Sequence, residues 1–203
     1  MKKRIAQRKL QRSFYTRPTL IVALDLLGKY LVRHSKGRRL VARIVEVEGY
    51  RGSIDPAAHT YRGKTKRNEV MYWGGGHLYV YFTYGMHFCA NVVTGEQESG
   101  EAVLIRAVEP VEGIDVMERN RFGSAKKLEP TRRSLSNGPA KLCQALSIGR
   151  KENGIDLLGD EIYILQAPPI SPSAVGRTGR IGITHGREKK WRFFMKGNQW
   201  VSR

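Results

Sequence analysis

The stretch Leu40-Val-Ala-Arg-Ile-Val-Glu-Val-Glu-Gly-Tyr50 decides the fold. Successive side chains of a strand point to opposite faces, and here apolar residues occupy both faces, which predicts a strand that is covered on both sides. One face holds Leu40, Ala42, Ile44, Glu46 and Glu48, and the other includes Val41, Val45 and Val47. Two carboxylates therefore fall near the end of a buried strand. A buried charge is costly unless it is paired or used in chemistry.

The rest of the chain predicts one α+β domain built around this strand. β-rich runs at 77–84 and 87–93, separated by Gly85-Met86, predict a hairpin, and a further strand is expected over 102–108. Short helices are expected before Gly28 and over 139–146, where Pro139 stands near the start. Neither an internal repeat nor a polar linker divides the chain. We therefore expect a loosely ordered basic arm over 1–13 and a single domain over 14–203.

The charge of the chain points to a polyanionic partner. Its 203 residues carry 36 Lys and Arg against 18 Asp and Glu, a net charge of +18. Basic residues dominate 1–43 and 119–203, whereas acidic residues outnumber them over 44–118. Such a cationic surface attracts nucleic acids in a salt-dependent manner. No long basic amphipathic helix is evident, so an anionic membrane is the weaker alternative.

Several classes of protein and site are excluded. Two cysteines, Cys89 and Cys143, rule out a disulfide scaffold and an all-cysteine zinc site, and both read as small core residues of a cytoplasmic protein. The five histidines lack metal-ligand spacing, and there is no phosphate-binding G-x-x-x-x-G-K-[ST] loop. No apolar run approaches the roughly 18 residues of a membrane span. The glycine-spaced stretch 176–182 reads as turn chemistry.

Glu48 is the first candidate for catalysis, with Glu46 close behind. Either carboxylate could instead be paired within the core, and periodicity alone favours that structural reading. Glu48 is preferred because it stands beside Tyr50 in the acidic centre of a basic protein, where partial burial would suit a general base. Arg106 lies in an apolar strand and needs a carboxylate partner, for which Glu46, Glu48 or Glu109 are available.

Tyrosines and a basic loop supply candidate nucleic-acid contacts. Tyr79 and Tyr81 share one face of a strand and could be core residues or stacking platforms for bases. Tyr84, near the hairpin tip, could act as a wedge in the base stack. The loop Tyr61–Asn68 contains Arg62, Lys64, Lys66 and Arg67, which could contact phosphates or simply be solvated.

Ordered motifs along nearly the whole chain resemble one enzyme family. They are Arg43–Tyr50, Ala57–His59, Lys66–Asn68, Leu78–Met86, Phe88–Asn91, Val103–Pro110, Gly138–Leu146 and Trp200–Ser202. Together they look like the alkyladenine (3-methyladenine) DNA glycosylase family in its compact bacterial form. The resemblance implies a compact domain around a strongly curved, mainly antiparallel sheet, with short helices packed on it and a protruding hairpin.

The resemblance also implies a function and a set of roles. A monofunctional glycosylase flips a damaged purine from duplex DNA and hydrolyses its N-glycosidic bond, leaving an abasic site without lyase cleavage. By matching position, Glu48 would activate water and Arg106 would help to hold it. The base pocket would comprise Tyr50, His59, Tyr81 and Asn91. The duplex gap would be filled by Tyr84, with Met86 beside it. DNA-contacting loop positions would be Lys64, Lys66 and Arg67.

These roles imply that the partner is double-stranded DNA with damaged purines. They imply neither a metal, an organic cofactor nor an obligate protein partner. The protein is expected to be a monomer that associates with the nucleoid. Two other classes stay open. A non-catalytic basic module, associated with RNA or the ribosome, would also suit the charge and the tyrosines. A nuclease or bifunctional lyase would need clustered carboxylates or an amine nucleophile in the pocket. The chain does not rank methylated, deaminated and etheno purines as substrates.

Overall fold

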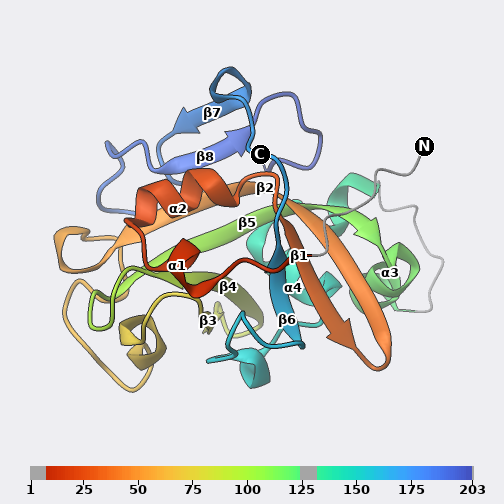
Figure 1. Cartoon of the computed structure of the whole chain (residues 1–203), viewed down its shortest axis with the longest axis horizontal. Helices are drawn as coiled ribbons and strands as arrows, with labels where there is room; N and C mark the ends of the chain where they lie inside the picture. Colours follow the sequence, from red (N-terminus) through yellow and green to blue (C-terminus); the bar gives the residue numbers. More distant parts are fainter. Residues whose placement is uncertain (1–7, 124–131, 203) are drawn as a thin grey trace.

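Eight antiparallel strands form one curled sheet in the computed structural model, which describes residues 8–123 and 132–202 (Figure 1). The strands are β1 (Tyr30–Ser35), β2 (Arg38–Arg51), β3 (Leu78–Thr83), β4 (His87–Thr94), β5 (Glu101–Glu112), β6 (Ile162–Leu165), β7 (Val175–Thr178) and β8 (Arg192–Met195). Their order is β3-β4-β5-β2-β1-β6, and β8 pairs with both β2 and β7. The predicted α+β class with a curved antiparallel sheet is confirmed.

Four short helices pack on this sheet. They are α1 (Arg12–Tyr15), α2 (Thr19–Leu26), α3 (Ile114–Phe122) and α4 (Pro139–Ala145). In Figure 1, α2 lies along β2 and β5. Helix α4 packs against β4 and β5 and also against α3. The helices expected before Gly28 and over 139–146 are confirmed. Single 3₁₀ turns occupy Gly52–Ile54, Glu69–Tyr72, Arg132–Leu135, Arg150–Glu152 and Pro172–Ala174.

Strand β2 is the centre of the structure. One edge pairs with β5 from Val41 to Arg51, and the other edge is shared by β1, then β8 over Glu46–Glu48. Burial on both faces matches the expectation for this stretch. The register with β5 is irregular between Ile44 and Glu46 and again between Glu46 and Val47, and it returns to its earlier offset from Val47 onward.

The main core joins the sheet to its helices. It gathers buried side chains from α2, β1, β2, β5, α4 and β6, among them Val22, Leu31, Val47, Ile105, Leu142 and Ile164. Both cysteines are free and buried, as expected. The β3–β4 hairpin instead extends into solvent at its tip, where Tyr84 is 84% exposed and Met86 66% exposed. The predicted protruding hairpin is therefore confirmed.

The arm expected over 1–13 is described only in its last part, since residues 1–7 lie outside the described residues. From Lys9 the chain is tied down: Lys9 forms a β-bridge with Leu165, Leu10 is buried and α1 begins at Arg12. None of the helices within 8–123 and 132–202 has the length and apolar character needed to cross a membrane.

Candidate active site

Glu46 is the first of the two carboxylates on β2. It is fully buried and accepts hydrogen bonds from Arg106 Nε at 3.1 Å and Arg192 Nε at 2.6 Å. Ser202 adds its backbone N–H at 2.6 Å and its hydroxyl at 2.8 Å. Three of these bonds reach Oε1 and one reaches Oε2, and the two guanidinium groups balance the negative charge of Glu46. Arg192 and Ser202 do not contact Glu48, so the two candidates that periodicity left nearly equal differ in their partners.

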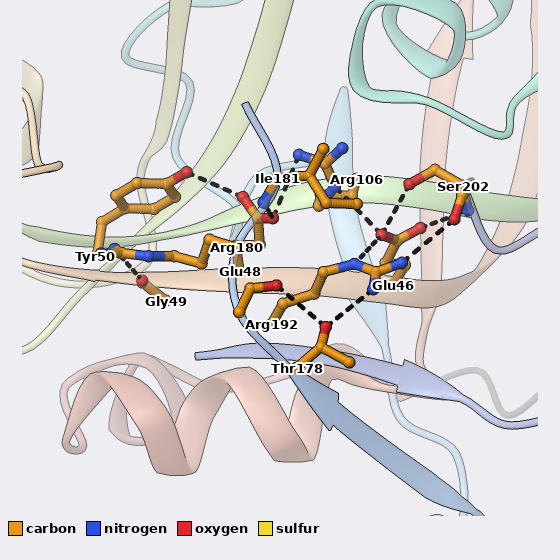
Figure 2. Close-up of polar contacts among 11 residues, drawn as sticks. Glu46, Glu48, Gly49, Tyr50, Arg106, Thr178, Arg180, Ile181, Arg192 and Ser202 are labelled. Atoms are coloured by element: carbon orange, nitrogen blue, oxygen red, sulfur yellow. Dashed lines mark hydrogen bonds and ion pairs between the residues drawn. The ribbon is translucent and has the colours of Figure 1, made fainter. Parts of the chain in front are cut away.

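Glu48 is also fully buried, but its surroundings differ. Its Oε1 accepts the backbone N–H of Ile181 at 2.8 Å and lies 3.3 Å from Arg106 Nη1. Among the residues that the structure describes, only the Tyr50 hydroxyl donates to its Oε2, at 2.9 Å. Figure 2 shows the two carboxylates side by side along β2, with Glu46 toward Ser202 and Glu48 toward Tyr50. Since Oε2 has a second lone pair, it can accept one more hydrogen bond.

A cavity of about 490 Å³ opens beside this carboxylate. The groups bonded to Glu48 line it: Tyr50, Arg106 and Ile181. Glu48 itself is not a lining residue and lies directly behind them. The predicted pairing of Arg106 with a carboxylate is confirmed twice over, because it contacts both Glu46 and Glu48.

Aromatic side chains form the walls of the cavity. The rings of Tyr79 and Tyr81 stack at 5.7 Å, and His59 meets Tyr81 edge-on with centroids 4.4 Å apart. His59 Nδ1 also lies 3.0 Å from the Tyr79 hydroxyl. Withdrawal of the His59 ring from water, assisted by the positive charge of Arg67, lowers its pKa to about 4. His59 is consequently neutral near pH 7, although its outer part is exposed at the rim.

Tyr50 is held as a hydrogen-bond donor. Burial raises the pKa of its hydroxyl far above the ordinary value, and the charge of Glu48 and the hydrogen bond to it add to this effect. Burial likewise raises the pKa of Tyr81, with a smaller contribution from Cys89. Neither phenol ionises near neutral pH. The proton on Tyr50 therefore fixes the orientation of the Glu48 carboxylate.

The structure brings together most of the residues predicted to act. Asn91, Tyr84 and Arg67 line the same cavity as Tyr50, His59, Tyr81 and Arg106. Asn91 comes from β4, is buried and donates its amide N–H to the Tyr79 carbonyl at 3.1 Å.

Three predicted residues lie away from the cavity wall. Met86 is exposed on the hairpin, and Lys64 and Lys66 are exposed in the basic loop. Lys64 contacts Glu98 at 3.1 Å. None of the three lines the cavity.

Sequence reasoning missed the C-terminal contributions. Ile181 bonds Glu48, Arg192 and Ser202 hold Glu46, and the buried Arg180 lies against the ring of Tyr50. The stretch 176–182, read only as turn chemistry, contains two of these residues. This stretch holds two arginines, each beside a glycine. In a basic protein with a buried pair of carboxylates, they were the signal that could have indicated a contact with that pair. Among the described residues, no group of three or more His, Cys, Asp or Glu could hold a metal ion.

Comparisons with known proteins agree with this geometry. The family model described as methylpurine-DNA glycosylase matches residues 13–199. A relative from Carboxydothermus hydrogenoformans is 52% identical over 195 residues, covering 96% of this chain and 98% of its own. Relatives from Desulfitobacterium hafniense and Clostridium acetobutylicum are 49% and 48% identical over 203 residues, covering 96% of this chain and 98% and 97% of their own. All three bear the name "Putative 3-methyladenine DNA glycosylase".

The family resemblance noted from the motifs is thus confirmed over nearly the whole chain. An enzyme is favoured over the non-catalytic basic module that composition left open, because the matching family is defined by glycosylase activity. The chain belongs to the methylpurine-DNA glycosylase family and is a DNA-binding hydrolase of N-glycosyl bonds.

Proposed function

We propose that the protein flips one alkylated or deaminated purine out of duplex DNA and hydrolyses its N-glycosidic bond with a water activated by Glu48. One observation carries the proposal: the groups bonded to the Glu48 carboxylate, which are Tyr50, Arg106 and Ile181, line the same aromatic cavity. The carboxylate therefore lies just behind the surface that a bound base would meet. A lone pair on its Oε2 is left for a water.

The cavity suits a single base rather than a strand. Its volume of about 490 Å³ is in the usual range for small-ligand sites, and its walls are tyrosine and histidine rings. Aromatic faces stack on any base, whereas the Asn91 amide offers polar groups that can discriminate among base edges. A base in a duplex reaches such a site only after leaving the stack.

The chemical step needs one base and one stabilising charge. Glu48 takes a proton from water while the water oxygen bonds to C1′ of the sugar. The C1′–N9 bond breaks, and its electron pair stays on the purine nitrogen. The transition state is oxocarbenium-like, so the remaining carboxylate charge also stabilises the positive sugar. A cationic alkylpurine leaves as a neutral base, while a neutral purine must receive a proton from another donor.

Arg106 and Tyr50 prepare Glu48 for this role. Arg106 Nη1 lies 3.3 Å from Oε1, and the Tyr50 hydroxyl donates to Oε2 at 2.9 Å. Neither contact uses the second lone pair of Oε2. They also hold the carboxylate plane, so that the free lone pair keeps one direction.

DNA would be held outside the cavity by the hairpin and the cationic surface. Tyr84 is 84% exposed at the tip and also lines the cavity mouth, which suits a side chain that fills the gap left by a flipped base. Arg67 lines the same mouth, and Lys64 and Lys66 extend the charge along the loop. These cations would contact phosphates and make binding salt-dependent.

We further propose that the product is an intact abasic site. A lyase needs an amine nucleophile, and the described residues that line the cavity include no lysine. Strand breaks should therefore appear only after treatment with alkali. Breaks without alkali would contradict this part of the proposal.

The test is single-turnover base release from duplexes that hold one hypoxanthine or one 7-methylguanine. Glu48→Gln keeps the shape of the side chain but removes the base, so release should fall by about 10²–10⁴-fold while duplex binding persists. Glu69→Gln is the matched control, because that carboxylate is exposed on the 3₁₀ turn Glu69–Tyr72. Release by Glu48→Gln at the wild-type rate would overturn the proposal.

A further inference from the structure

Arg180 is a buried cation that the proposed chemistry does not use. Neither its side chain nor that of Asp55 is exposed at all, and the two guanidinium tips donate to the two Asp55 oxygens at 2.5 and 2.7 Å. Arg180 Nη1 also donates to the Gly49 carbonyl at 3.0 Å, a contact visible in Figure 2. This two-pronged pairing sets the plane of the guanidinium group.

The guanidinium group also lies over two aromatic rings, with which it forms a cation–π stack. Its central carbon lies 4.6 Å from the ring centre of Tyr50 and 5.1 Å from that of Trp191. Tyr50 lines the cavity, whereas Arg180 does not. Arg180 therefore backs the Tyr50 ring, and the opposite side of the ring is left for the cavity. A planar cation on an aromatic face restricts how that ring can tilt.

The ion pair links this stack to another wall of the cavity. Asp55 accepts the backbone N–H groups of Arg51 and Ala57, both at 3.2 Å, and Ala57 lines the cavity. Burial alone would raise the pKa of Asp55, but the hydrogen bonds and charge of Arg180 outweigh it and hold the pKa below the ordinary value. The carboxylate thus stays ionised and keeps the loop attached.

The segment that carries Arg180 also contacts Glu48. The next residue, Ile181, donates its backbone N–H to Glu48 at 2.8 Å. Gly49, which accepts from Arg180, stands between Glu48 and Tyr50 in β2. The Arg180 side chain therefore contacts Gly49 and Tyr50, and through Asp55 it is joined to the loop that carries Ala57 and His59. Its neighbour Ile181 holds Glu48.

We propose that Arg180 is a positioning residue for base excision: it sets the Tyr50 ring and the Ala57 loop at a fixed place relative to Glu48. The inference rests on the proposed function, since it assumes that the base occupies the cavity. Arg180 acts through Tyr50 and Asp55 and touches no reacting atom. Its replacement should therefore slow base release without lowering the affinity for the duplex. A misplacement of about 1 Å can lower a rate by about 10²-fold.

The test compares base release with DNA affinity in Arg180→Lys. Lysine keeps the charge opposite Asp55 but has neither the planar stack nor the two-pronged bond. Single-turnover release from a hypoxanthine duplex should fall by about 10–100-fold. The dissociation constant for a duplex with a tetrahydrofuran abasic-site analogue should stay within about twofold. Arg177→Lys is the matched control, because Arg177 is exposed on β7 and stacks on Phe193 away from the cavity.

Wild-type release by Arg180→Lys would overturn the inference, and so would equal losses of release and duplex affinity. If Arg180→Lys does not fold, Trp191→Leu removes the outer layer of the stack and leaves the ion pair intact. The same separation of release from affinity is expected there, and its absence overturns the inference. Glu48→Gln is measured in parallel. Normal release by Glu48→Gln would refute the proposed function, whereas a loss there with normal Arg180→Lys refutes only the role of Arg180.

Discussion

Replacement of Glu46 by Gln should destabilise the protein far more than it slows base release. The neutral amide removes the charge that faces two guanidinium groups, at 3.1 Å from Arg106 Nε and 2.6 Å from Arg192 Nε. Arg106 keeps the charge of Glu48, but the contacts left to Arg192 are neutral: the amide oxygen, the Thr178 hydroxyl, the Ser202 carbonyl and the Phe194 ring. Arg192 is 90% withdrawn from solvent, since its side chain is 10% exposed. It would therefore be left without a counter-charge.

The expected loss follows from that unpaired cation. Removal of one partner from a buried ion pair costs about 3–5 kcal/mol, and the polar contacts left to Arg192 place Glu46→Gln near the lower end. For a chain of this length, about 3 kcal/mol corresponds to a melting temperature lower by roughly 6–12 °C. Glu48→Gln should cost less, because its amide oxygen can still accept from Ile181 and Arg106 keeps Glu46.

The assay pairs urea unfolding with single-turnover base release, the latter measured well below both melting temperatures. Glu46→Gln should lose stability and keep release within about tenfold of wild type, whereas Glu48→Gln should lose release by about 10²-fold or more. Because both residues are buried glutamates two positions apart on β2, each variant is the control for the other. Greater destabilisation in Glu48→Gln than in Glu46→Gln would refute this division of roles.

Three further outcomes are expected. Tyr84→Ala should lower base release but change the unfolding free energy by less than about 0.5 kcal/mol, because the ring is 84% exposed; normal release would contradict its role as wedge. Because the pKa of His59 is about 4, wild type and His59→Gln should show pH–rate profiles of the same shape above about pH 5.5; an inflection near 6.5 lost in the variant would disprove this. Gly75→Ala should cost about 1–3 kcal/mol in urea unfolding, since its Cβ would lie 2.6 Å from the Tyr15 carbonyl, while Gly74→Ala, with nothing within 4 Å, should be neutral; equal effects would contradict the packing.

Local rules were enough to predict the β3–β4 hairpin and the carboxylate partner of Arg106. The Gly85-Met86 break between two β-rich runs predicted the hairpin, and the lone Arg106 in an apolar strand required a carboxylate partner. Both expectations rest on neighbours in sequence or on the cost of an unpaired charge. They are confirmed by the pairing of β3 with β4 and by the contacts of Arg106 with Glu46 and Glu48.

Long-range contacts could not be predicted in the same way. The alternation of residue types in β2 carries no information about which loop covers Glu48, so Ile181 and Arg180 were missed. It also made Glu46 and Glu48 look equivalent, because both fall on one face at a spacing of two. Their partners distinguish them: Ser202 and Arg192 reach Glu46, whereas Ile181 reaches Glu48. The register shift near Val45 was likewise invisible, because a single irregular residue leaves the hydrophobic pattern nearly unchanged.

The sequence separation between the two carboxylates and their partners determines when their contacts can form during synthesis. Glu48 and Ile181 are separated by 133 residues, and Glu46 and Ser202 by 156. Synthesis proceeds from the N-terminus, so the hairpin with Tyr84 leaves the ribosome before Ile181, Arg192 and Ser202 do. The hydrogen bonds that hold Glu46 and Glu48 can therefore all form only after Ser202 has been synthesised.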